Sequence, residues 1–316
     1  MSGKNATQVL TTDAAGIARA AAILREGGLV AVPTETVYGL AARADSAEAV
    51  AKIYRAKGRP DFNPLIVHVS GLEQACELAE IDPRAEQLAA AFWPGPLTMV
   101  LPLKESAPIA PAVTAGLPTI ALRSPAHPAM RHLLTETGLP LAAPSANRSG
   151  AVSPTRAGHV LASLGGRIEA VVDGGQCAQG LESTIVALRP GGWQILRPGP
   201  VTETQIMQLL GEPLAGESGK IEAPGQLVRH YSPGKPIRLK AGEAEVDEFM
   251  IGFGPVAGDC NLAEDGDLAA AASRLYECLH MAASSKKRRI AVAPVPLEGI
   301  GEAINDRLRR AAALED

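Results

Sequence analysis

Short apolar runs recur between amphipathic segments over residues 9–211, and this alternation is the feature that most constrains the fold. The runs are five to seven residues long and include LVAVP (29–33), LIVHV (65–69), LTMVLPL (97–103), TIALR (119–123), PLAAP (140–144) and STIVAL (183–188). Such runs, bounded by Gly and Pro, are typical of buried strands. The amphipathic segments predict helices over 13–26, 46–57, 82–92, 128–137, 155–164 and 202–211. Because the two kinds alternate irregularly, they predict a mixed α/β (α+β) fold with a mixed sheet rather than a regular βαβ array.

The chain divides into two domains and a connecting segment. Residues 212–235 have no hydrophobic period and are rich in Pro and Gly, which predicts a linker between a domain at 9–211 and a second at 236–316. The second domain has three predicted strands, with helices over 267–284 and 300–313, and is expected to be small and Rossmann-like. A length of 316 residues fits two domains at roughly 150 residues each.

Several classes of protein are disfavoured. No stretch approaches the ~20 apolar residues of a membrane helix, and the first ten residues lack the apolar core of a secretory signal. The four cysteines are far apart and form no C-x-x-C, which argues against a zinc site and against a disulfide scaffold. We therefore expect a reduced, cytoplasmic enzyme with no membrane partner.

Two segments offer a cationic and polar site, although the usual phosphate-binding motif G-x-x-x-x-G-K-[ST] is absent. Thr34 and Thr36 follow the strand at 29–33, where they either orient a small polar ligand or form a turn that satisfies its own backbone. Lys57 and Arg59 lie at a helix–strand break stiffened by Pro, which suits a polyphosphate if the pair is not simply solvated. Asn63 and His68 extend the same segment; His68 lies in an otherwise apolar strand and is either a ligand residue or a structural one.

Three further segments carry polar residues at strand ends. Arg123 ends a predicted strand and is well placed to clamp a carboxylate. The loop after 140–144 contains Ser145 and Ser153 and no acid, so it either hosts an anion or is a plain turn. Ser183 and Arg197 add a hydroxyl and a cation. The excess of cations over acids favours a multiply anionic substrate and catalysis by positioning and charge neutralisation, and it disfavours a two-carboxylate hydrolase.

Taken together, the segments resemble a known family. They are VPTETVYGL, KGRPDFNPLIVHV, WPGPLT, TIALRSPAHP, APSANRSG, ESTIV and LRPG, and they occur in the order typical of the YrdC-domain family. APGQLVRHYSP (223–233) resembles the linker motif of its two-domain long form, L-threonylcarbamoyladenylate synthase, and GIGEAINDRLRRA (299–311) resembles the end of that form's C-terminal domain. The resemblance spans nearly the whole chain and implies a twisted mixed-sheet YrdC-like catalytic domain at 9–211.

The resemblance implies a nucleotidyltransferase. The family condenses L-threonine, bicarbonate or CO₂, and ATP into threonylcarbamoyl-AMP and releases pyrophosphate. The product serves the threonylcarbamoyl modification of a tRNA adenosine next to the anticodon, which implies hand-over to a tRNA threonylcarbamoyl transferase. Mg²⁺ is expected to arrive with ATP, and no metal bound by the protein itself is expected.

The resemblance also assigns residues. Those implied for threonine are Thr36, His68, Arg123 and Ser183. Those implied for ATP are Lys57, Arg59, Asn63, Thr119, Ala143, Ser145, Ser153, Arg197, His230 and Tyr231. Lys57 and Arg59 are the implied catalytic cations. His230 or Tyr231 would reach back from the linker at 212–235, which is expected to act as a lid that keeps water from the mixed anhydride.

Two alternatives differ in class. An RNA-binding module for double-stranded RNA or tRNA, without catalysis, would use a concave cationic surface. A net charge of -4 and few aromatic residues (4 Phe, 2 Trp, 4 Tyr) disfavour it, and the basic run 286–289 is as easily a solvated loop. Carbamoyl transfer, the activity of related domains in hydrogenase maturation, is disfavoured because those proteins carry Cys-rich zinc modules that this chain lacks.

Overall fold

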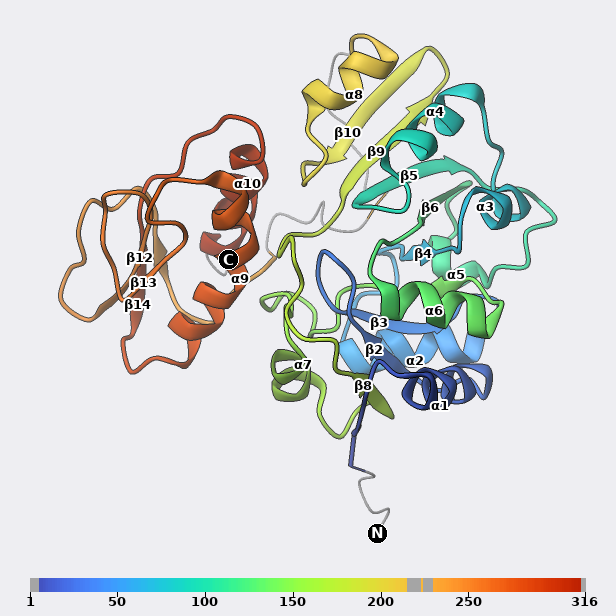
Figure 1. Cartoon of the computed structure of the whole chain (residues 1–316), viewed down its shortest axis with the longest axis horizontal. Helices are drawn as coiled ribbons and strands as arrows, with labels where there is room; N and C mark the ends of the chain where they lie inside the picture. The colour runs from blue at the N-terminus through green and yellow to red at the C-terminus, as the bar shows by residue number, and fades with distance from the viewer. Residues whose placement is uncertain (1–5, 215–222, 224–229, 314–316) are drawn as a thin grey trace.

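A large N-terminal domain and a small C-terminal domain make up the computed structural model, which describes residues 6–214, 223 and 230–313 (Figure 1). The strands of the large domain are β1 (Gln8–Leu10), β2 (Val30–Val32), β3 (Gly39–Arg43), β4 (Ile66–His68), β5 (Leu97–Pro102), β6 (Thr119–Arg123), β7 (Leu141–Ala142), β8 (Ala170–Val172), β9 (Thr184–Arg189) and β10 (Gly192–Arg197). Its helices are α1 (Ala14–Arg25), α2 (Ala47–Lys57), α3 (Leu72–Leu78), α4 (Pro83–Phe92), α5 (Pro111–Thr114), α6 (Pro128–Thr137), α7 (Ala157–Leu164) and α8 (Glu203–Leu210).

The strands of the large domain form one ten-stranded sheet in the order β1-β8-β2-β3-β7-β4-β6-β5-β9-β10. Parallel pairs (β1 with β8, β4 with β6, β5 with β9) alternate with antiparallel pairs (β2 with β3, β5 with β6, β9 with β10). The sheet is therefore mixed, and the predicted mixed-sheet fold is confirmed.

Helices cover both faces of this sheet. Because side chains alternate along a strand, Val30 and Val32 of β2 pack into one apolar cluster with α1 and α6, whereas Ala31 packs into another with Ile53 of α2. Helix α1 begins at Asp13, whose carboxylate accepts from the Gly16 N–H at 2.8 Å. Because helices cover both faces of the sheet, the strand ends and the loops after them remain as the polar parts of the domain.

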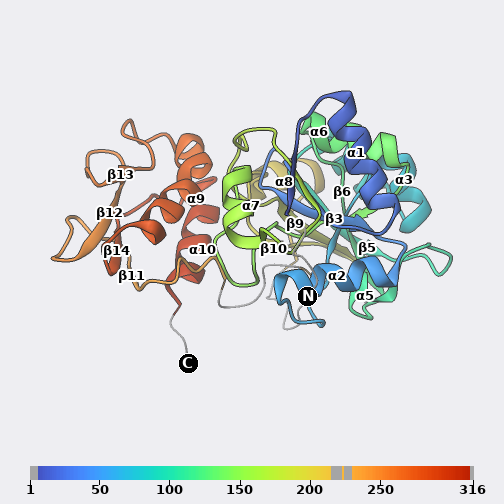
Figure 2. The same ribbon diagram turned by 90° about the horizontal axis from the view of Figure 1, so that it is seen from below.

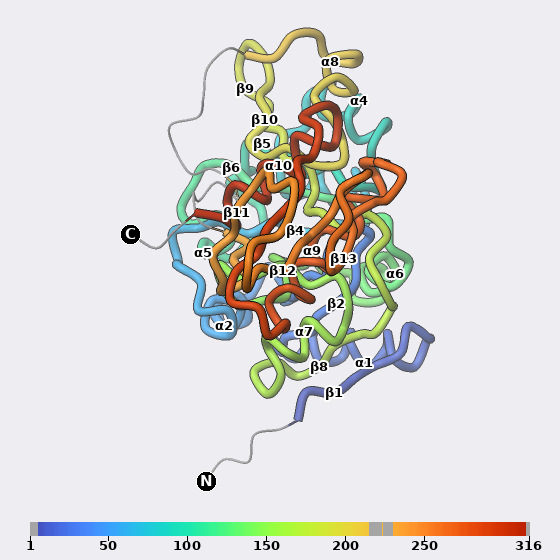
Figure 3. The backbone as a smooth tube through the Cα atoms, turned by 90° about the vertical axis from the view of Figure 1, so that its left-hand side faces the viewer, coloured from blue at the N-terminus to red at the C-terminus, as the bar shows by residue number. Residues whose placement is uncertain are grey.

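The C-terminal domain is a small parallel sheet with two helices. Its elements are β11 (Ile237–Arg238), β12 (Glu248–Gly252), β13 (Cys260–Asn261), α9 (Leu268–Ser284), β14 (Arg289–Val292) and α10 (Gly301–Ala312). The strands are parallel in the order β11-β14-β12-β13. Helices α9 and α10 lie between this sheet and the large domain, with α7 beside them (Figure 2), and the C-terminal domain covers one end of the large sheet (Figure 3). The predicted small Rossmann-like domain is confirmed.

Five short elements were not predicted from the sequence: β1, β3, α3, α5 and β13. The most informative is β3, because the sequence predicts a loop that closes at Gly39, where the strand in fact begins and pairs with Val32. None of its five residues is β-branched and three are Gly or Ala, so their strand structure comes from pairing with β2 and β7 rather than from local propensity.

The predicted linker at 212–235 lies mostly outside the described residues, which include only 212–214, 223 and 230–235 of it. The domain boundaries and the proposed lid therefore stay predictions. In the described part of the chain, none of the helices has both the length and the apolar character needed to cross a membrane.

Candidate active site

The ends of several strands of the large sheet surround a pocket. It is lined by Thr34, Thr36, Val37, Gly39, Arg59, Ile66, His68, Arg123, Ala143, Pro144, Ser145, Glu182, Ser183, Arg197 and His230. These residues come from segments that are far apart in the sequence. Their cations and hydroxyls thus meet in one place, as the strand-end pattern predicts.

Arg123, at the end of β6, forms the fixed cation of one side of the pocket. Its Nη1 donates to Thr36 Oγ1 at 2.9 Å, its Nη2 donates to a Glu35 carboxylate oxygen at 2.7 Å, and its Nε donates to the Gly95 carbonyl at 3.2 Å. Burial opposes ionisation of Glu35, but the Arg123 charge and hydrogen bond prevail and lower the pKa of that carboxyl. Glu35 is therefore ionised at neutral pH, and Arg123 is held in one orientation.

Thr34 and Thr36 both lie in the turn that follows β2. The Thr34 hydroxyl accepts from the N–H groups of Thr36 and Val37 and donates to the Val37 carbonyl at 2.7 Å. The local turn proposed for Thr34 is therefore real. Both residues line the pocket, but Thr36 differs because its hydroxyl contacts Arg123 as well as Thr34.

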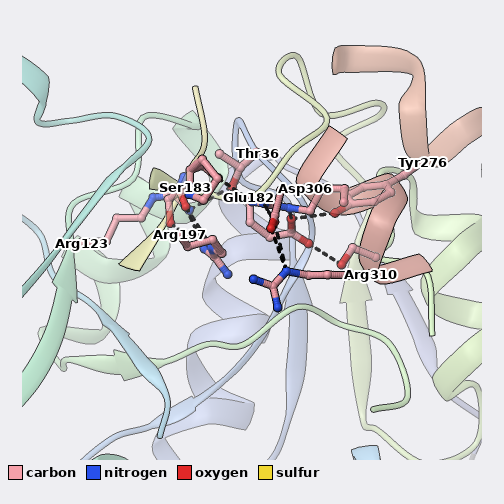
Figure 4. Close-up of polar contacts among 11 residues, drawn as sticks. Thr36, Arg123, Glu182, Ser183, Arg197, Tyr276, Asp306 and Arg310 are labelled. Carbon is pink, nitrogen blue, oxygen red and sulfur yellow. Dashed lines mark hydrogen bonds and ion pairs between the residues drawn. The ribbon is translucent and has the colours of Figure 1, made fainter. Parts of the chain in front are cut away.

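Ser183 and Arg197 form a second polar unit of the pocket. The Arg197 Nη2 donates to the Ser183 carbonyl at 2.9 Å and to the Ser183 Oγ at 3.1 Å, and Thr98 contacts the same hydroxyl at 2.7 Å. Gly199 allows the chain after Arg197 to pass close to β9, since a Cβ there would lie 2.4 Å from the Thr184 nitrogen. Figure 4 shows Thr36, Arg123, Ser183 and Arg197 gathered together, with Glu182 beside them.

Lys57 and Arg59 lie at the end of α2, on either side of Gly58, whose positive φ of 61° turns the chain. The Lys57 Nζ is buried and donates to the carbonyls of Ser145 and Asn147, each at 2.6 Å. Burial and the neighbouring Arg59 charge lower the pKa of Lys57. Burial is also the main cause that lowers the pKa of Arg59 to about 10, and Arg197 adds to this effect. These cations are close enough to repel one another, a cost that a bound polyanion would relieve.

Four buried polar atoms near the pocket have no hydrogen-bond partner among the described residues: Asn63 Oδ1, His68 Nδ1, His230 Nδ1 and the Tyr231 hydroxyl. Buried polar groups in proteins are normally satisfied, so such atoms need an explanation. Burial, followed by Arg123, lowers the pKa of His68, and burial lowers that of His230 to about 3. Both imidazoles are thus neutral near pH 7 and can each offer a ring nitrogen to a ligand.

Nine of the predicted site residues line the pocket: Thr36, Arg59, His68, Arg123, Ala143, Ser145, Ser183, Arg197 and His230. The others lie behind or away from it. Lys57 holds the 145–147 loop, Ser153 donates to Glu182 at 2.5 Å, and Tyr231 packs with the C-terminal domain. Thr119 starts β6 and Arg123 ends it, which separates them by roughly 13 Å along the strand.

Sequence reasoning gave no role to Glu182, the acid that lines the pocket. Its carboxylate accepts from Ser153 Oγ, from the Tyr276 hydroxyl at 2.7 Å and from Arg307 Nε at 3.0 Å. Burial would raise its pKa, but the charges of Arg307 and Arg197 outweigh burial and lower the pKa to about 2. The signal available in the sequence was its position directly before Ser183 in segments that contain few acids.

Comparisons with known proteins cover both domains. The family model described as "Telomere recombination" matches residues 22–199, and a model for the C-terminal domain of threonylcarbamoyl-AMP synthase matches residues 201–313. A threonylcarbamoyl-AMP synthase of Bacillus subtilis is 41% identical over 97% of this chain and 95% of its own length. One of Pyrococcus abyssi is 39% identical over 93% of each.

Solved structures give the same result. The crystal structure of Pyrococcus abyssi Sua5 complexed with L-threonine matches with a TM-score of 0.89 and 36% identity, over 97% of this chain and 98% of that one. A structure of full-length HypF shares 22% identity over 57% of this chain with a TM-score of 0.52, which shows a common fold alone. The relatives confirm the predicted synthase, a nucleotidyltransferase-type enzyme, and do not favour the RNA-binding alternative. The chain belongs to the two-domain threonylcarbamoyl-AMP synthase family.

Proposed function

We propose that the pocket binds L-threonine beside ATP and condenses both with bicarbonate to give threonylcarbamoyl-AMP and pyrophosphate. The observation that carries this proposal is the meeting of Arg59, Arg123 and Arg197 around one pocket with a neutral histidine and several hydroxyls. A triphosphate and a carboxylate together need several fixed cations, and guanidinium groups suit both.

Threonine would bind at Arg123. Among the described residues, Glu35, Thr36 and Gly95 use three of the five N–H groups of this guanidinium, and the other two would donate to a substrate carboxylate. The unpartnered Nδ1 of His68 would accept from the threonine ammonium, because this imidazole is neutral near pH 7. The hydroxyls of Thr36 and Ser183 would complete this end.

ATP would bind at the side of Arg59 and Arg197. Ser145 and the backbone at Ala143 line this side, and His230 offers its unpartnered Nδ1. The resemblance also assigns Asn63, Thr119, Ser153 and Tyr231 to ATP. The Asn63 Oδ1 and the Tyr231 hydroxyl are buried without a partner among the described residues, which supports their assignment to ATP. The Ser153 hydroxyl instead donates to Glu182, which does not support a contact with ATP.

The chemistry requires charge neutralisation rather than an enzyme nucleophile. The threonine ammonium first loses a proton to solvent. Its nitrogen then forms a bond to the carbon of CO₂ with loss of a second proton, or to the carbon of bicarbonate with loss of water. The resulting carbamate oxygen attacks the α-phosphorus. The bond from that phosphorus to the bridging oxygen breaks, and pyrophosphate leaves with the electron pair. Arg59 and Arg197 would neutralise the charge that develops on the phosphates. Lys57 would act beside them by fixing the 145–147 loop, to which it is bound.

Mg²⁺ remains an expectation that comes with the nucleotide. The described residues contain no group of three or more His, Cys, Asp or Glu side chains able to hold a metal ion. The two carboxylates nearest the pocket, Glu35 and Glu182, are each engaged by an arginine. A magnesium ion would then be bound through the triphosphate.

Release of pyrophosphate tests the proposal. With ATP and bicarbonate present, threonine is expected to stimulate release strongly over serine and over no amino acid. Equal rates in all three reactions would contradict the assigned substrate. RNA binding is tested separately by filter binding at two salt concentrations, where a steep salt dependence without threonine-dependent turnover would support the RNA-binding alternative. Hand-over of the product to a tRNA threonylcarbamoyl transferase and a cytoplasmic location are part of the same proposal.

A further inference from the structure

The C-terminal domain holds one acid of the active-site pocket. Glu182 lines the pocket directly before Ser183. Among the described residues, two of the three side chains that donate to its carboxylate come from the C-terminal domain: Tyr276 of α9 at 2.7 Å (Figure 4) and Arg307 of α10 at 3.0 Å. The third, Ser153, belongs to the large domain. The position of Glu182 is therefore set in part by residues more than 90 positions away in the sequence.

Arg307 also contacts the segment that carries Arg197. Its Nη2 donates to the Pro198 carbonyl at 3.0 Å, and Pro198 directly follows Arg197. Arg197 in turn holds the carbonyl and the hydroxyl of Ser183. A single guanidinium of α10 thus contacts both segments, 182–183 and 197–198, that bring Ser183 and Arg197 to the pocket.

Arg307 is itself fixed in place. Its side chain is fully buried, its Nη1 pairs with Asp306 at 2.7 Å, and its guanidinium lies over the Tyr231 ring at 5.4 Å. Helix α10 also contacts the segment that carries His230, because the Arg310 carbonyl accepts from the His230 N–H at 3.4 Å. Helix α10 therefore touches the chain beside three pocket-lining residues: Ser183, Arg197 and His230.

A second contact between the domains provides a contrast. Arg156 near α7 pairs with Glu277 of α9 at 3.0 Å, and His159 lies 3.6 Å from the same carboxylate. None of these residues lines the pocket or contacts Glu182 in the described structure. This pair joins the same two domains without a direct contact to Glu182 or to Pro198.

We propose that Arg307 and Tyr276 are positioning residues of the active site, which act through Glu182 and Pro198 to hold Arg197 where the nucleotide phosphates bind. The C-terminal domain thereby completes the ATP side of a pocket whose other residues all belong to the large domain and the linker. The inference rests on the proposed function in assigning this side of the pocket to ATP. Small displacements of such groups have large effects, since a shift of about 1 Å can lower a rate by roughly a hundredfold.

The test uses the full-length protein and measures the Kd for ATP by calorimetry together with kcat/KM for ATP. Tyr276→Phe keeps the ring and removes one donor to Glu182. Arg307→Lys keeps the positive charge but lacks the guanidinium that contacts both Glu182 and Pro198. We expect each variant to weaken ATP binding by about tenfold, as for the loss of a hydrogen bond to a charged group. Glu277→Gln, the matched control on α9, should bind ATP like the wild type even if its Tm falls as much as that of Tyr276→Phe.

A double variant separates positioning from general stability. If Tyr276 acts through Glu182, Tyr276→Phe should add less than a twofold effect on the Kd in a Glu182→Gln background. A folded Tyr276→Phe protein that binds ATP like the wild type would overturn the inference. So would a Glu277→Gln protein that is equally impaired, or a full additive effect in the double variant. Should Arg307→Lys fail to fold, Tyr276→Phe and the double variant still decide the question.

The two proposals fail in different ways. Loss of the proposed function would appear as a wild-type protein that binds ATP but shows no threonine-dependent release of pyrophosphate. Because the Kd for ATP requires no turnover, it would still compare Tyr276→Phe with Glu277→Gln in that case. Failure of the inference would appear as equal ATP affinity in these two variants of an active enzyme.

Discussion

The Arg123 guanidinium and the Glu35 carboxylate form a buried ion pair at 2.7 Å, with side chains only 4% and 10% exposed. Glu35 also accepts from the Ala126 N–H at 3.0 Å, so it is bound on both oxygens. The pair fixes the guanidinium before any substrate arrives and balances its charge in a place where an unpaired cation would be costly. A substrate carboxylate would then meet a donor whose direction is already set.

Arg123→Lys is expected to lower kcat/KM for threonine by about a hundredfold, because an ammonium group cannot reproduce the fork that contacts Glu35, Thr36 and the substrate. The KM for ATP should change little, since Arg123 lies on the opposite side of the pocket from Arg197 in this assignment. Steady-state release of pyrophosphate at varied threonine checks this. Arg43→Lys, at the surface pair with Asp45, is the control. Unchanged threonine kinetics would remove Arg123 from the threonine site.

Threonine binding should depend little on the protonation of His68. Burial and Arg123 hold the pKa of His68 below its usual value of 6.5, so its neutral form persists as the pH falls through the range where an ordinary histidine becomes charged. We expect the calorimetric Kd for threonine to stay constant between about pH 8 and 6 in the wild type. His68→Phe, which removes the acceptor, should weaken binding about tenfold. A sharp loss of affinity near pH 6.5 in the wild type would argue against the neutral acceptor.

Arg197→Lys should weaken ATP binding more than threonine binding. The substitution keeps a positive charge but loses the two-nitrogen contact with Ser183, so the remaining ammonium is no longer fixed toward the phosphates. A loss of about tenfold in ATP affinity is expected, measured by calorimetry. Arg309→Lys, an exposed residue of α10, provides the matched control. Equal losses for ATP and threonine would show that Arg197 supports the whole pocket rather than its phosphate side.

The free energy of unfolding should decrease in acid because the Glu182 carboxylate becomes protonated. Its pKa in the folded protein, about 2, lies below the ordinary 4.5, so the ionised carboxylate stabilises the fold above about pH 4.5 and this contribution is lost as the pH falls toward 2. The shift corresponds to roughly 3 kcal/mol. Thermal unfolding from about pH 6 to 3 should show a steeper decline in Tm for the wild type than for Glu182→Gln. Parallel curves would show that Glu182 does not govern the acid response. Glu277→Gln again serves as the control, since its carboxylate is partly exposed.

Most of the site residues could be found from the sequence because their chemistry is local. Lys57 and Arg59 follow a helix that stops at Gly58, and Arg123 ends a strand that is apolar up to that point, so each cation lies at a place where a buried element meets a loop. The ordered motifs also identified the family, which the relatives confirm. Local pattern was less informative for β3, where small residues form a strand only because β2 and β7 pair with it.

The sequence by itself determined the mixed α/β class, the two domains and the set of cations and hydroxyls, since these depend on hydrophobic period, turn residues and side-chain chemistry along short segments. Only the tertiary structure decided which of these groups face one another. It paired Arg123 with Glu35, turned Lys57 toward a backbone loop, and joined Glu182 to Arg307 across 125 positions of the chain. The reason is physical: strand order and domain docking are set by long-range pairing and burial, and neither leaves a mark in the residues near each partner.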